Sequence, residues 1–403
     1  MKRPHTCSFL AAAALSVAAT ALSAATDANH PGVVSEPAGV KLTGEDIAAL
    51  KPGRTFILSG SPVNVKVMNV PRLVTNEFSR RYCFDCFGDE TLAKLRKQEK
   101  LDAVVKDANS EFDRMVRLMD WAYKRIKLFG PPASRPGDPL KLLKAVDAGE
   151  GFNCGYYAML LRQALRSMGY VARSLGLKGA KGDGNGSEHG VVEVWSNEHR
   201  KWVVLDPTLN VYFTRKDVPL NGYEVRREWF YNDGGKDLTI VIGAAGAKHT
   251  VKDLPIARGT HPGFGTLRLR PESIGKFLYL AYTPTTAEGK PDYGRMFITK
   301  DKLCEGVPYH TRICPKDPAR DPYWPMQQAA LTLTAGEGAT INAKAETMTP
   351  DFAKFQHRID GGKWKDGAPS DWGLNNGDNT LEVRAVNKFG VEGAVSKVVL
   401  QME

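Results

Sequence analysis

The chain has 403 residues, of which 42% are apolar and 25% are charged. This composition excludes a disordered chain, and the length is too great for one ordinary core, so about two to four domains are expected. The formal net charge of +10 is spread along the sequence, and the basic residues are not interleaved with aromatics in one tract. These features argue against a nucleic-acid-binding protein.

Residues 1–25 have the pattern of a secretory signal peptide. Lys2 and Arg3 precede an apolar run over residues 9–22, and small residues follow at 23–25. The alternative is an uncleaved membrane anchor, but the run is short, rich in alanine and interrupted by Ser and Thr. No later stretch reaches spanning length. We therefore expect a secreted or periplasmic protein with no integral membrane segment after signal cleavage.

The next part of the sequence, residues 26–109, is interpreted as an N-terminal extension whose pattern becomes helical from Asp89. Ser110 is a predicted helix N-cap, because apolar residues recur after it at three- and four-residue steps as far as Ile126. The sequence therefore predicts an amphipathic helix whose apolar stripe is core. Prolines then turn the chain before a short predicted helix over residues 140–147.

Cys154 lies in the first turn of a further predicted helix. Apolar residues follow it at helical spacing as far as Met168, in one buried stripe that ends at Gly169. Residues 170–177 predict a strand. A glycine-rich loop follows this strand.

Two strand-like runs come next, over residues 189–195 and 201–205, and a five-residue turn joins them. This arithmetic predicts an antiparallel hairpin. Asp206 closes the second strand because Pro207 cannot continue a central strand. The open end of the hairpin is therefore expected to bring His189 and Asp206 side by side.

The C-terminal part of the sequence is predicted to be β-rich. Short β-like runs lie among Gly and Pro over residues 231–328, and the proline-rich segment 315–325 is interpreted as a linker. From residue 329 to 403, short strands recur with regular turn signals, which predicts a small β-sandwich. The predicted helices and hairpin before them place an α+β domain at residues 110–230.

Five cysteines remain after the signal segment, an odd number for an oxidising compartment. Cys304 and Cys314 flank a nine-residue loop and are candidates for a local disulfide. Cys83 and Cys86 form a C-x-x-C pair that fits a tight disulfide, a redox pair or half of a zinc site. Export favours a disulfide, and the doubled spacing typical of zinc sites is missing. Cys154 is the cysteine left without a partner by this count.

Cys154, His189 and Asp206 are candidates for a catalytic triad. A helix N-terminus stabilises a thiolate, and an imidazole fixed by a carboxylate can accept the thiol proton and later protonate a leaving amine. Each residue alone is more often structural: a core cysteine, a hydrogen-bonded histidine and a turn-forming aspartate. Their order along a helix, a strand and a hairpin is what favours catalysis.

Four segments carry a resemblance to the transglutaminase-like superfamily over about residues 110–212. They are the runs GFNCGYYA (151–158), GYVAR (169–173), HGVVEVW (189–195) and WVVLDPT (202–208). The resemblance implies a papain-like α+β core, with a helix-borne cysteine packed on an antiparallel sheet. In that core Cys154 attacks an amide or acyl carbonyl, His189 moves the proton and Asp206 orients His189. The segment 355–400 resembles the Ig-like or fibronectin-like modules of exported bacterial proteins.

The chain also departs from the family pattern. Gly155 stands where cross-linking animal transglutaminases carry tryptophan, and no calcium-loop sequence is evident, which weakens protein cross-linking as the activity. Tyr156 and Val191 replace residues common in bacterial relatives, so substrate contacts are not carried over. The second donor of an oxyanion hole and the role of residues 231–328 are not assigned from the sequence.

The leading hypothesis is an exported cysteine-dependent peptidase or amidase that forms a thioester acyl-enzyme. Its substrate would be a peptide, a protein or a cell-wall polymer, and no metal or other cofactor is expected. One alternative is a transamidase, in which an amine captures the same acyl-enzyme. The other is a noncatalytic envelope-binding or structural protein that retains the fold.

Overall fold

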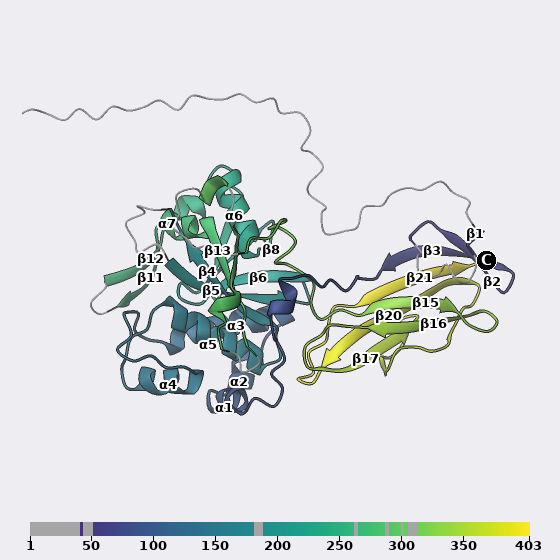
Figure 1. The fold of residues 1–403 in the computed structure, drawn as a ribbon, viewed down its shortest axis with the longest axis horizontal. Helices are drawn as coiled ribbons and strands as arrows, with labels where there is room; N and C mark the ends of the chain where they lie inside the picture. The colour runs from purple at the N-terminus through teal and green to yellow at the C-terminus, as the bar shows by residue number, and fades with distance from the viewer. Residues whose placement is uncertain are drawn as a thin grey trace, which may run out of the picture.

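The computed structural model describes residues 41–42, 51–180, 188–261, 265–286, 290–299, 302–304 and 313–403. Within these ranges the chain forms two domains that lie side by side, one of mixed α+β structure and one of β-strands (Figure 1). The predicted α+β class is confirmed, because helices pack against an antiparallel sheet and further β-rich sheets lie toward the C-terminus. The predicted signal peptide falls outside the described residues. No helix among the described residues is long and apolar enough to cross a membrane.

A nine-stranded sheet, antiparallel at every neighbouring pair, forms the centre of the α+β domain. The predicted hairpin is confirmed, with Trp195 opposite Trp202 in the register. In spatial order the strands are β10 (Ala247–Thr250), β9 (Thr239–Ile242), β7 (Val211–Arg215), β6 (Lys201–Asp206), β5 (Glu188–Ser196), β4 (Ala172–Lys178), β13 (Tyr279–Thr283) and β14 (Phe297–Thr299). The short β8 (Val218–Pro219) pairs with β7, and β11 (Ile256–His261) and β12 (Gly265–Leu269) form a separate ribbon.

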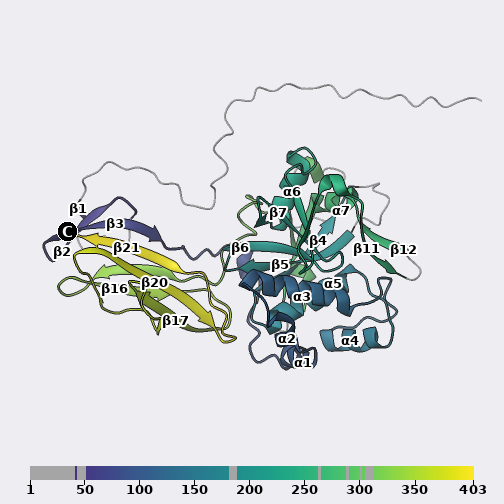
Figure 2. The ribbon, with the colours of Figure 1, turned by 180° about the vertical axis from the view of Figure 1, so that it is seen from behind.

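Helices cover both faces of this sheet (Figure 2). Val192 and Val194 of β5 face the core shared with the first five helices, whereas Val191 and Trp195 face a second core. This alternation follows from the two-residue repeat of a strand. The first group of helices is α1 (Glu90–Gln98), α2 (Leu101–Val105), α3 (Glu111–Arg125), α4 (Pro139–Asp147) and α5 (Cys154–Ser167), and the second is α6 (Gly222–Tyr231) and α7 (Pro271–Gly275).

Of the two helices nearest the sheet, α3 begins at the predicted cap Ser110, and α5 begins at Asn153, a cap that was not predicted. The Ser110 side chain accepts a hydrogen bond from the Asp113 N–H at 3.2 Å, and the Asn153 side chain accepts one from the Gly155 N–H at 3.1 Å. Gly169 follows α5 with a φ of +87°, the left-handed conformation that glycine adopts without strain. The predicted helices over 110–126 and after residue 154 are therefore confirmed.

The β-domain has two sheets that share one core. The larger sheet, in spatial order, contains β1 (Lys41–Leu42), β2 (Thr55–Leu58), β3 (Ser61–Asn69), β21 (Ser396–Met402), β20 (Gly377–Asn387), β17 (Phe352–Ile359) and β18 (Lys365–Asp366). The smaller contains β15 (Ala330–Ala335), β16 (Thr340–Glu346) and β19 (Trp372–Gly373). Residues 26–109 are thus not one extension: strands β1 to β3 complete the C-terminal sheet, while α1 and α2 belong to the α+β domain.

Residues 231–328 also differ from the separate β-rich region expected. Strands β9, β10, β13 and β14 extend the nine-stranded sheet on both sides. The proline-rich segment interpreted as a linker packs against this sheet, where the Trp202 indole N–H donates to the Trp324 carbonyl at 2.9 Å. Trp324 is 2% exposed. The segment is held in place because its aromatic side chains are buried in the second core.

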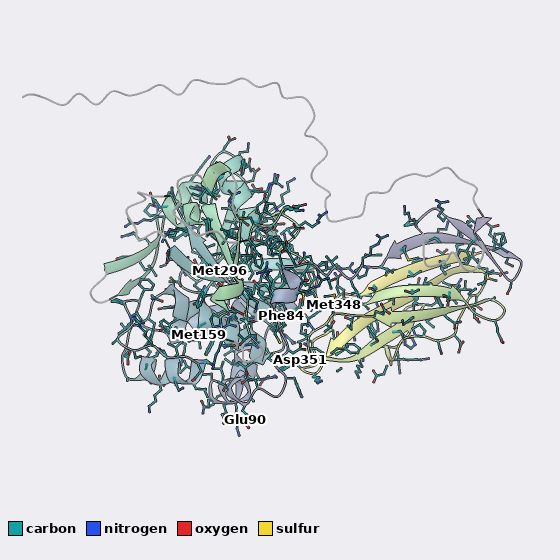
Figure 3. The ribbon with its side chains drawn as sticks, in the orientation of Figure 1. Phe84, Glu90, Met159, Met296, Met348 and Asp351 are labelled. Atoms are coloured by element: carbon teal, nitrogen blue, oxygen red, sulfur yellow. The ribbon has the colours of Figure 1, made fainter. Side chains whose placement is uncertain are left out.

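The segment before α1 contacts the β-domain at the junction where Figure 3 labels Phe84 and Asp351. The Asp351 carboxylate accepts hydrogen bonds from the backbone N–H groups of Cys86 at 2.8 Å and Phe87 at 3.1 Å. At a second contact, a Cβ added to Gly169 would lie 2.5 Å from the Cβ of Phe389. The domains are therefore in direct contact at the C-terminal end of α5.

The structure does not support the two disulfides suggested by cysteine spacing. Cys83 and Cys86 are free thiols, and the Cys86 thiol donates instead to the Arg166 carbonyl at 3.6 Å. Cys304 is also a free thiol, buried against the Leu278 carbonyl at 3.5 Å, whereas Cys314 is exposed. Packing of Cys86 and Cys304 against the α+β domain thus turns each thiol toward a backbone carbonyl.

Candidate active site

Cys154 is the first residue of α5, next to Gly190 of the central strand β5. The entry to the helix is fixed by Phe152, whose N–H donates to the Leu128 carbonyl at 2.9 Å and whose carbonyl accepts from Gly130 at 3.2 Å. Because the first N–H groups of a helix have no partner within it, the thiol lies at the positive end of the helix dipole. This position favours a thiolate.

His189 and Asp206 meet at the open end of the β5–β6 hairpin, as the hairpin arithmetic predicted. The His189 Nε2 lies 2.8 Å from the Asp206 Oδ2, and the two side chains are 10% and 5% exposed. The other carboxylate oxygen, Oδ1, accepts the N–H groups of Thr208 at 2.9 Å and Leu209 at 3.1 Å. The carboxylate is therefore held on both oxygens, and it fixes the imidazole so that Nδ1 is left for another partner.

That partner is Cys154, which is hydrogen-bonded to His189. Burial raises the pKa of the Cys154 thiol, but the hydrogen bond and charge of His189 and the Gly190 backbone N–H outweigh it, and the pKa is lowered. Burial lowers the pKa of His189, yet Asp206 and Cys154 together raise it to about 10. A thiolate paired with an imidazolium is the arrangement that these shifts favour.

A close approach of two backbones holds the helix against the strand at this point. A Cβ added to Gly190 would lie 3.4 Å from the Gly155 Cα and 3.6 Å from the Cys154 carbonyl carbon. The two glycines therefore let β5 approach the first turn of α5, which brings the Gly190 N–H to the sulfur.

One known family matches the part of the chain that contains these three residues. The sequence profile of the transglutaminase-like superfamily matches residues 98–207, a range that contains Cys154, His189 and Asp206. Residues 98–207 form a transglutaminase-like domain. The resemblance stated from the four sequence runs is thereby confirmed.

The comparison with solved structures gave a match of low similarity. A candidate cysteine protease from Cytophaga hutchinsonii matches with 12% sequence identity and a TM-score of 0.25, over 37% of this chain and 49% of that chain. The chain thus spans about half the length of that protein. The search of curated proteins gave no match.

Two supports of the transglutaminase-like site were not predicted from the sequence. They are the Gly190 N–H that contacts the thiol and the pair of N–H groups, from Thr208 and Leu209, that hold Asp206. The turn-forming character of Asp206 before Pro207 was a signal for the second, because an aspartate commonly accepts the N–H groups two and three residues later. Nothing in the sequence alone marked Gly190 as a hydrogen-bond donor.

Arg173, the other residue noted at a family position, lies in a buried ion pair. Its guanidinium donates to Glu193 at 2.7 and 2.9 Å, and both residues are 0% exposed. The cation also lies 4.1 Å from the ring centre of Trp202, and further aromatic rings enclose it. Arg173 therefore joins β4 to β5 in the interior and does not contact the thiol.

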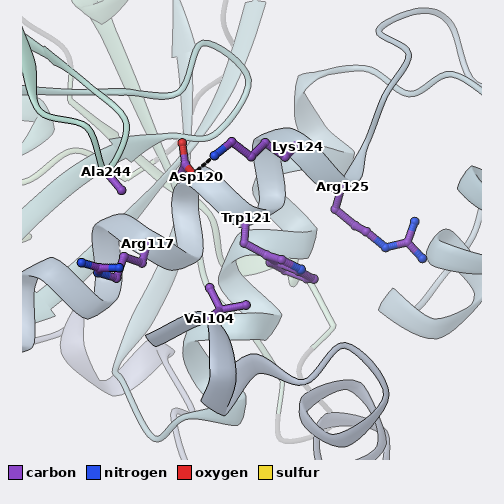
Figure 4. Close-up of a pocket in the computed structure, with 7 residues that line it drawn as sticks. All are labelled: Val104, Arg117, Asp120, Trp121, Lys124, Arg125 and Ala244. Atoms are coloured by element: carbon purple, nitrogen blue, oxygen red, sulfur yellow. Dashed lines mark hydrogen bonds and ion pairs between the residues drawn. The ribbon is translucent and has the colours of Figure 1, made fainter. Parts of the chain in front are cut away.

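A hollow of about 360 Å³ lies elsewhere on the transglutaminase-like domain, along α3 (Figure 4). It is lined by Val104, Arg117, Asp120, Trp121, Lys124, Arg125 and Ala244. Its cations are engaged in ion pairs: Lys124 with Asp120, Arg117 with Asp113, and Arg125 with Glu99 and Asp147. No triad residue lines this hollow, and it offers no nucleophile.

Metal ligation has no support in the described part of the chain. No group of three or more His, Cys, Asp and Glu side chains is arranged there to hold a metal ion. Half of a zinc site was one interpretation of Cys83 and Cys86. In the structure, the contacts of these two residues are hydrogen bonds with other parts of the protein. Cys83 pairs through its backbone with Thr285, and the Cys86 thiol contacts a carbonyl.

Proposed function

We propose that this protein is a cysteine-dependent amide hydrolase, a peptidase or amidase, that uses Cys154, His189 and Asp206. The observation that carries the proposal is the continuous chain of contacts from the Cys154 thiol through His189 to a carboxylate held on both oxygens. A purely structural histidine would not require a thiol of lowered pKa on its other side.

The reaction begins when the Cys154 sulfur attacks the carbonyl carbon of an amide. The electron pair of the carbonyl moves to its oxygen, where the Cys154 backbone N–H at the start of α5 is placed to donate a hydrogen bond. The C–N bond then breaks as His189 protonates the leaving amine, and a thioester remains on Cys154. Asp206 holds the ring in place throughout.

Water completes the cycle in the proposed hydrolase. Neutral His189 takes a proton from water, the resulting hydroxide oxygen attacks the thioester carbon, and the C–S bond breaks. The acid is released and the Cys154 thiolate pairs again with protonated His189. An amine in place of water would give transamidation by the same steps.

The decisive experiment is a substrate panel with a Cys154→Ala control. The purified protein is incubated with a peptide mixture, casein and peptidoglycan fragments, each with and without a labelled amine donor, and products are identified by mass spectrometry. We expect new carboxyl termini that depend on Cys154. Incorporation of the amine without hydrolysis would replace the proposal with a transamidase, and no Cys154-dependent product would leave a noncatalytic binding protein.

We also propose that the protein acts outside the cytoplasm. The support is the basic start, apolar run and small residues of positions 1–25. Measurement of the intact mass of the protein recovered from its producing cell tests this. Loss of about the first 25 residues is expected, and an intact N-terminus in the cytoplasmic fraction would contradict export.

A further inference from the structure

The β11–β12 ribbon, which projects from the side of the α+β domain (Figure 2), carries an arginine that reaches the turn of the triad acid. The Arg258 Nε donates to the Leu209 carbonyl at 2.7 Å, and the Leu209 N–H donates to the Asp206 Oδ1 at 3.1 Å. The Tyr123 hydroxyl of α3 donates to the Arg258 carbonyl. Arg258 is therefore fixed through both its backbone and its side chain. It contacts Leu209, which in turn donates to the triad residue Asp206.

The guanidinium of Arg258 keeps donors that this anchoring does not use. Among the described residues, no carboxylate lies within ion-pair distance of the Arg258 guanidinium. Neither Nη atom is a fully buried atom without a hydrogen-bond partner. The side chain is half-buried, with the guanidinium carbon 5.7 Å from the Tyr123 ring centre. Among the residues that the structure describes, only the Nε donor of its five N–H donors has a hydrogen-bond partner, so the two amino groups are left for a ligand.

Nearby acidic groups do not occupy these donors. The two oxygens of Asp120 are bonded to Asn210 and Lys124. Both oxygens of Asp206 are bonded to His189, Thr208 and Leu209. Burial lowers the pKa of Arg258, whereas Tyr123, Asp120 and Asp206 act to raise it. An arginine stays a cation at neutral pH.

The net charge of the triad indicates a role for the Arg258 cation. A thiolate and a carboxylate against one imidazolium leave one net negative charge at the site, which would repel an acidic substrate. Arg258 contacts Leu209 in the turn that holds Asp206, and its guanidinium offers the opposite charge in a planar fork suited to a carboxylate.

We propose that Arg258 binds a carboxylate of the substrate, so that the preferred substrates are amides with a carboxylate close to the scissile bond. This inference deepens the proposed function and rests on it. Arg258 is a specificity-determining residue that acts on the substrate's charge. The competing view is that Arg258 only braces the Leu209 turn, in which case its loss would affect neutral and anionic molecules alike.

Alkylation of Cys154 by two matched reagents separates these views without any substrate. Iodoacetate carries a carboxylate beside its reactive carbon, and iodoacetamide is its neutral counterpart. The measured quantity is the rate with iodoacetate divided by the rate with iodoacetamide at Cys154, from mass spectrometry of the peptide that contains it. This ratio is expected to fall about fivefold or more in Arg258→Gln. Increasing salt should lower the ratio of the unmodified protein toward that of the variant.

Arg268 provides the matched control. It lies on the other strand of the same ribbon, opposite Ala257 in the register, and no hydrogen bond joins it to the triad turn among the described residues. Arg268→Gln removes the same charge from the ribbon and should keep the ratio of the unmodified protein. An equal fall of both rates in Arg258→Gln, or an equal change of the ratio in Arg268→Gln, would overturn the proposal.

The second arm uses peptides that differ only in one charge. Amide substrates found in the panel above are compared as the free carboxylate and as the carboxamide at the position next to the scissile bond. The preference in kcat/KM for the carboxylate is expected to be about tenfold in the unmodified protein and close to one in Arg258→Gln. If no amide is cleaved, the proposed function fails, whereas the alkylation ratio still tests Arg258.

Discussion

A cysteine lies at each end of helix α5, and the pKa values of the two thiols are shifted in opposite directions. At the N-terminal end, Cys154 meets His189 and the Gly190 N–H, and its pKa is lowered. At the C-terminal end, Cys86 donates to the Arg166 carbonyl, and burial with the nearby Asp351 and Asp89 raises its pKa to about 12, against the charge of Arg166.

This contrast indicates that the pKa of a thiol depends on the groups that surround it. Both thiols lie partly buried against the same helix, but one faces N–H donors and a cation, and the other faces a carbonyl at the negative end of the helix dipole. The family match over residues 98–207 contains Cys154 together with His189 and Asp206, whereas Cys86 lies outside it. The other end is instead where the two domains meet.

The largest expected effect is the difference in alkylation between the two cysteines. With a pKa of about 12, Cys86 carries very little thiolate at pH 7. Iodoacetamide should therefore modify Cys154 at least about a thousand times faster than Cys86 at that pH. The measurement is a time course of each cysteine-containing peptide by mass spectrometry, and comparable rates would remove the contrast between the two ends.

Removal of the imidazole should bring the two thiols closer together. In His189→Ala, the pKa of Cys154 loses its main lowering partner, and the alkylation rate at pH 6.5 is expected to fall about a hundredfold. Cys86 should not change. His199→Ala, at the opposite end of the same hairpin, is the matched control and should leave the Cys154 rate as it is. A large effect of the control would mean that the hairpin, not the imidazole, sets the rate.

The pH dependence of activity tests the charge state of His189. Because the pKa of His189 rises from 6.5 to about 10 in the folded protein, the imidazolium persists up to about pH 10, and the ion pair exists between the lowered pKa of Cys154 and that value. Activity per enzyme should fall about tenfold for each pH unit above this limit.

The same shift sets a window for stability. The stabilisation from protonated His189 is complete below pH 6.5 and is lost as the pH rises toward about 10, because the folded pKa lies above the unfolded one. The denaturant midpoint of the unmodified protein should thus decline over this window more than that of His189→Ala. Parallel curves for the two proteins would contradict the raised pKa.

The smallest effect is expected at the domain junction. Asp351 contributes to the raised pKa of Cys86 after burial, so Asp351→Asn should increase the alkylation of Cys86 at pH 10 by less than about tenfold. The carboxamide oxygen introduced by this substitution would still accept one backbone hydrogen bond, which keeps the segment in place. If the alkylation rate of Cys86 in Asp351→Asn reached that of Cys154, burial would not be the main cause of the raised pKa of Cys86.

Much of the candidate site was predictable because its signals are local. The spacing after Cys154 predicted a helix, the five-residue turn predicted the hairpin, and Pro207 predicted where its second strand ends. Given these elements, the meeting of His189 with Asp206 follows from the pairing of two antiparallel strands.

The parts that sequence reasoning missed depend on contacts between distant segments. The strand over residues 61–69 has its sheet partner at the C-terminus, and the proline-rich segment around Trp324 packs under β4 and β6 through side chains whose partners lie far away. The disulfide hypothesis failed for a related reason, since Cys86 and Cys304 were assigned by spacing alone, whereas tertiary packing sets where each thiol points. Arg258 likewise gave no local signal.

During synthesis, strand β3 leaves the ribosome long before its sheet can close. Val398 of β21 pairs with Met68 of β3, about 330 residues later in the chain, so this contact forms only after the α+β domain has been synthesised. The α+β domain can bury its own cores before that point. Loss of β21 would leave β3 with an unpaired edge, and such an edge invites association with other chains.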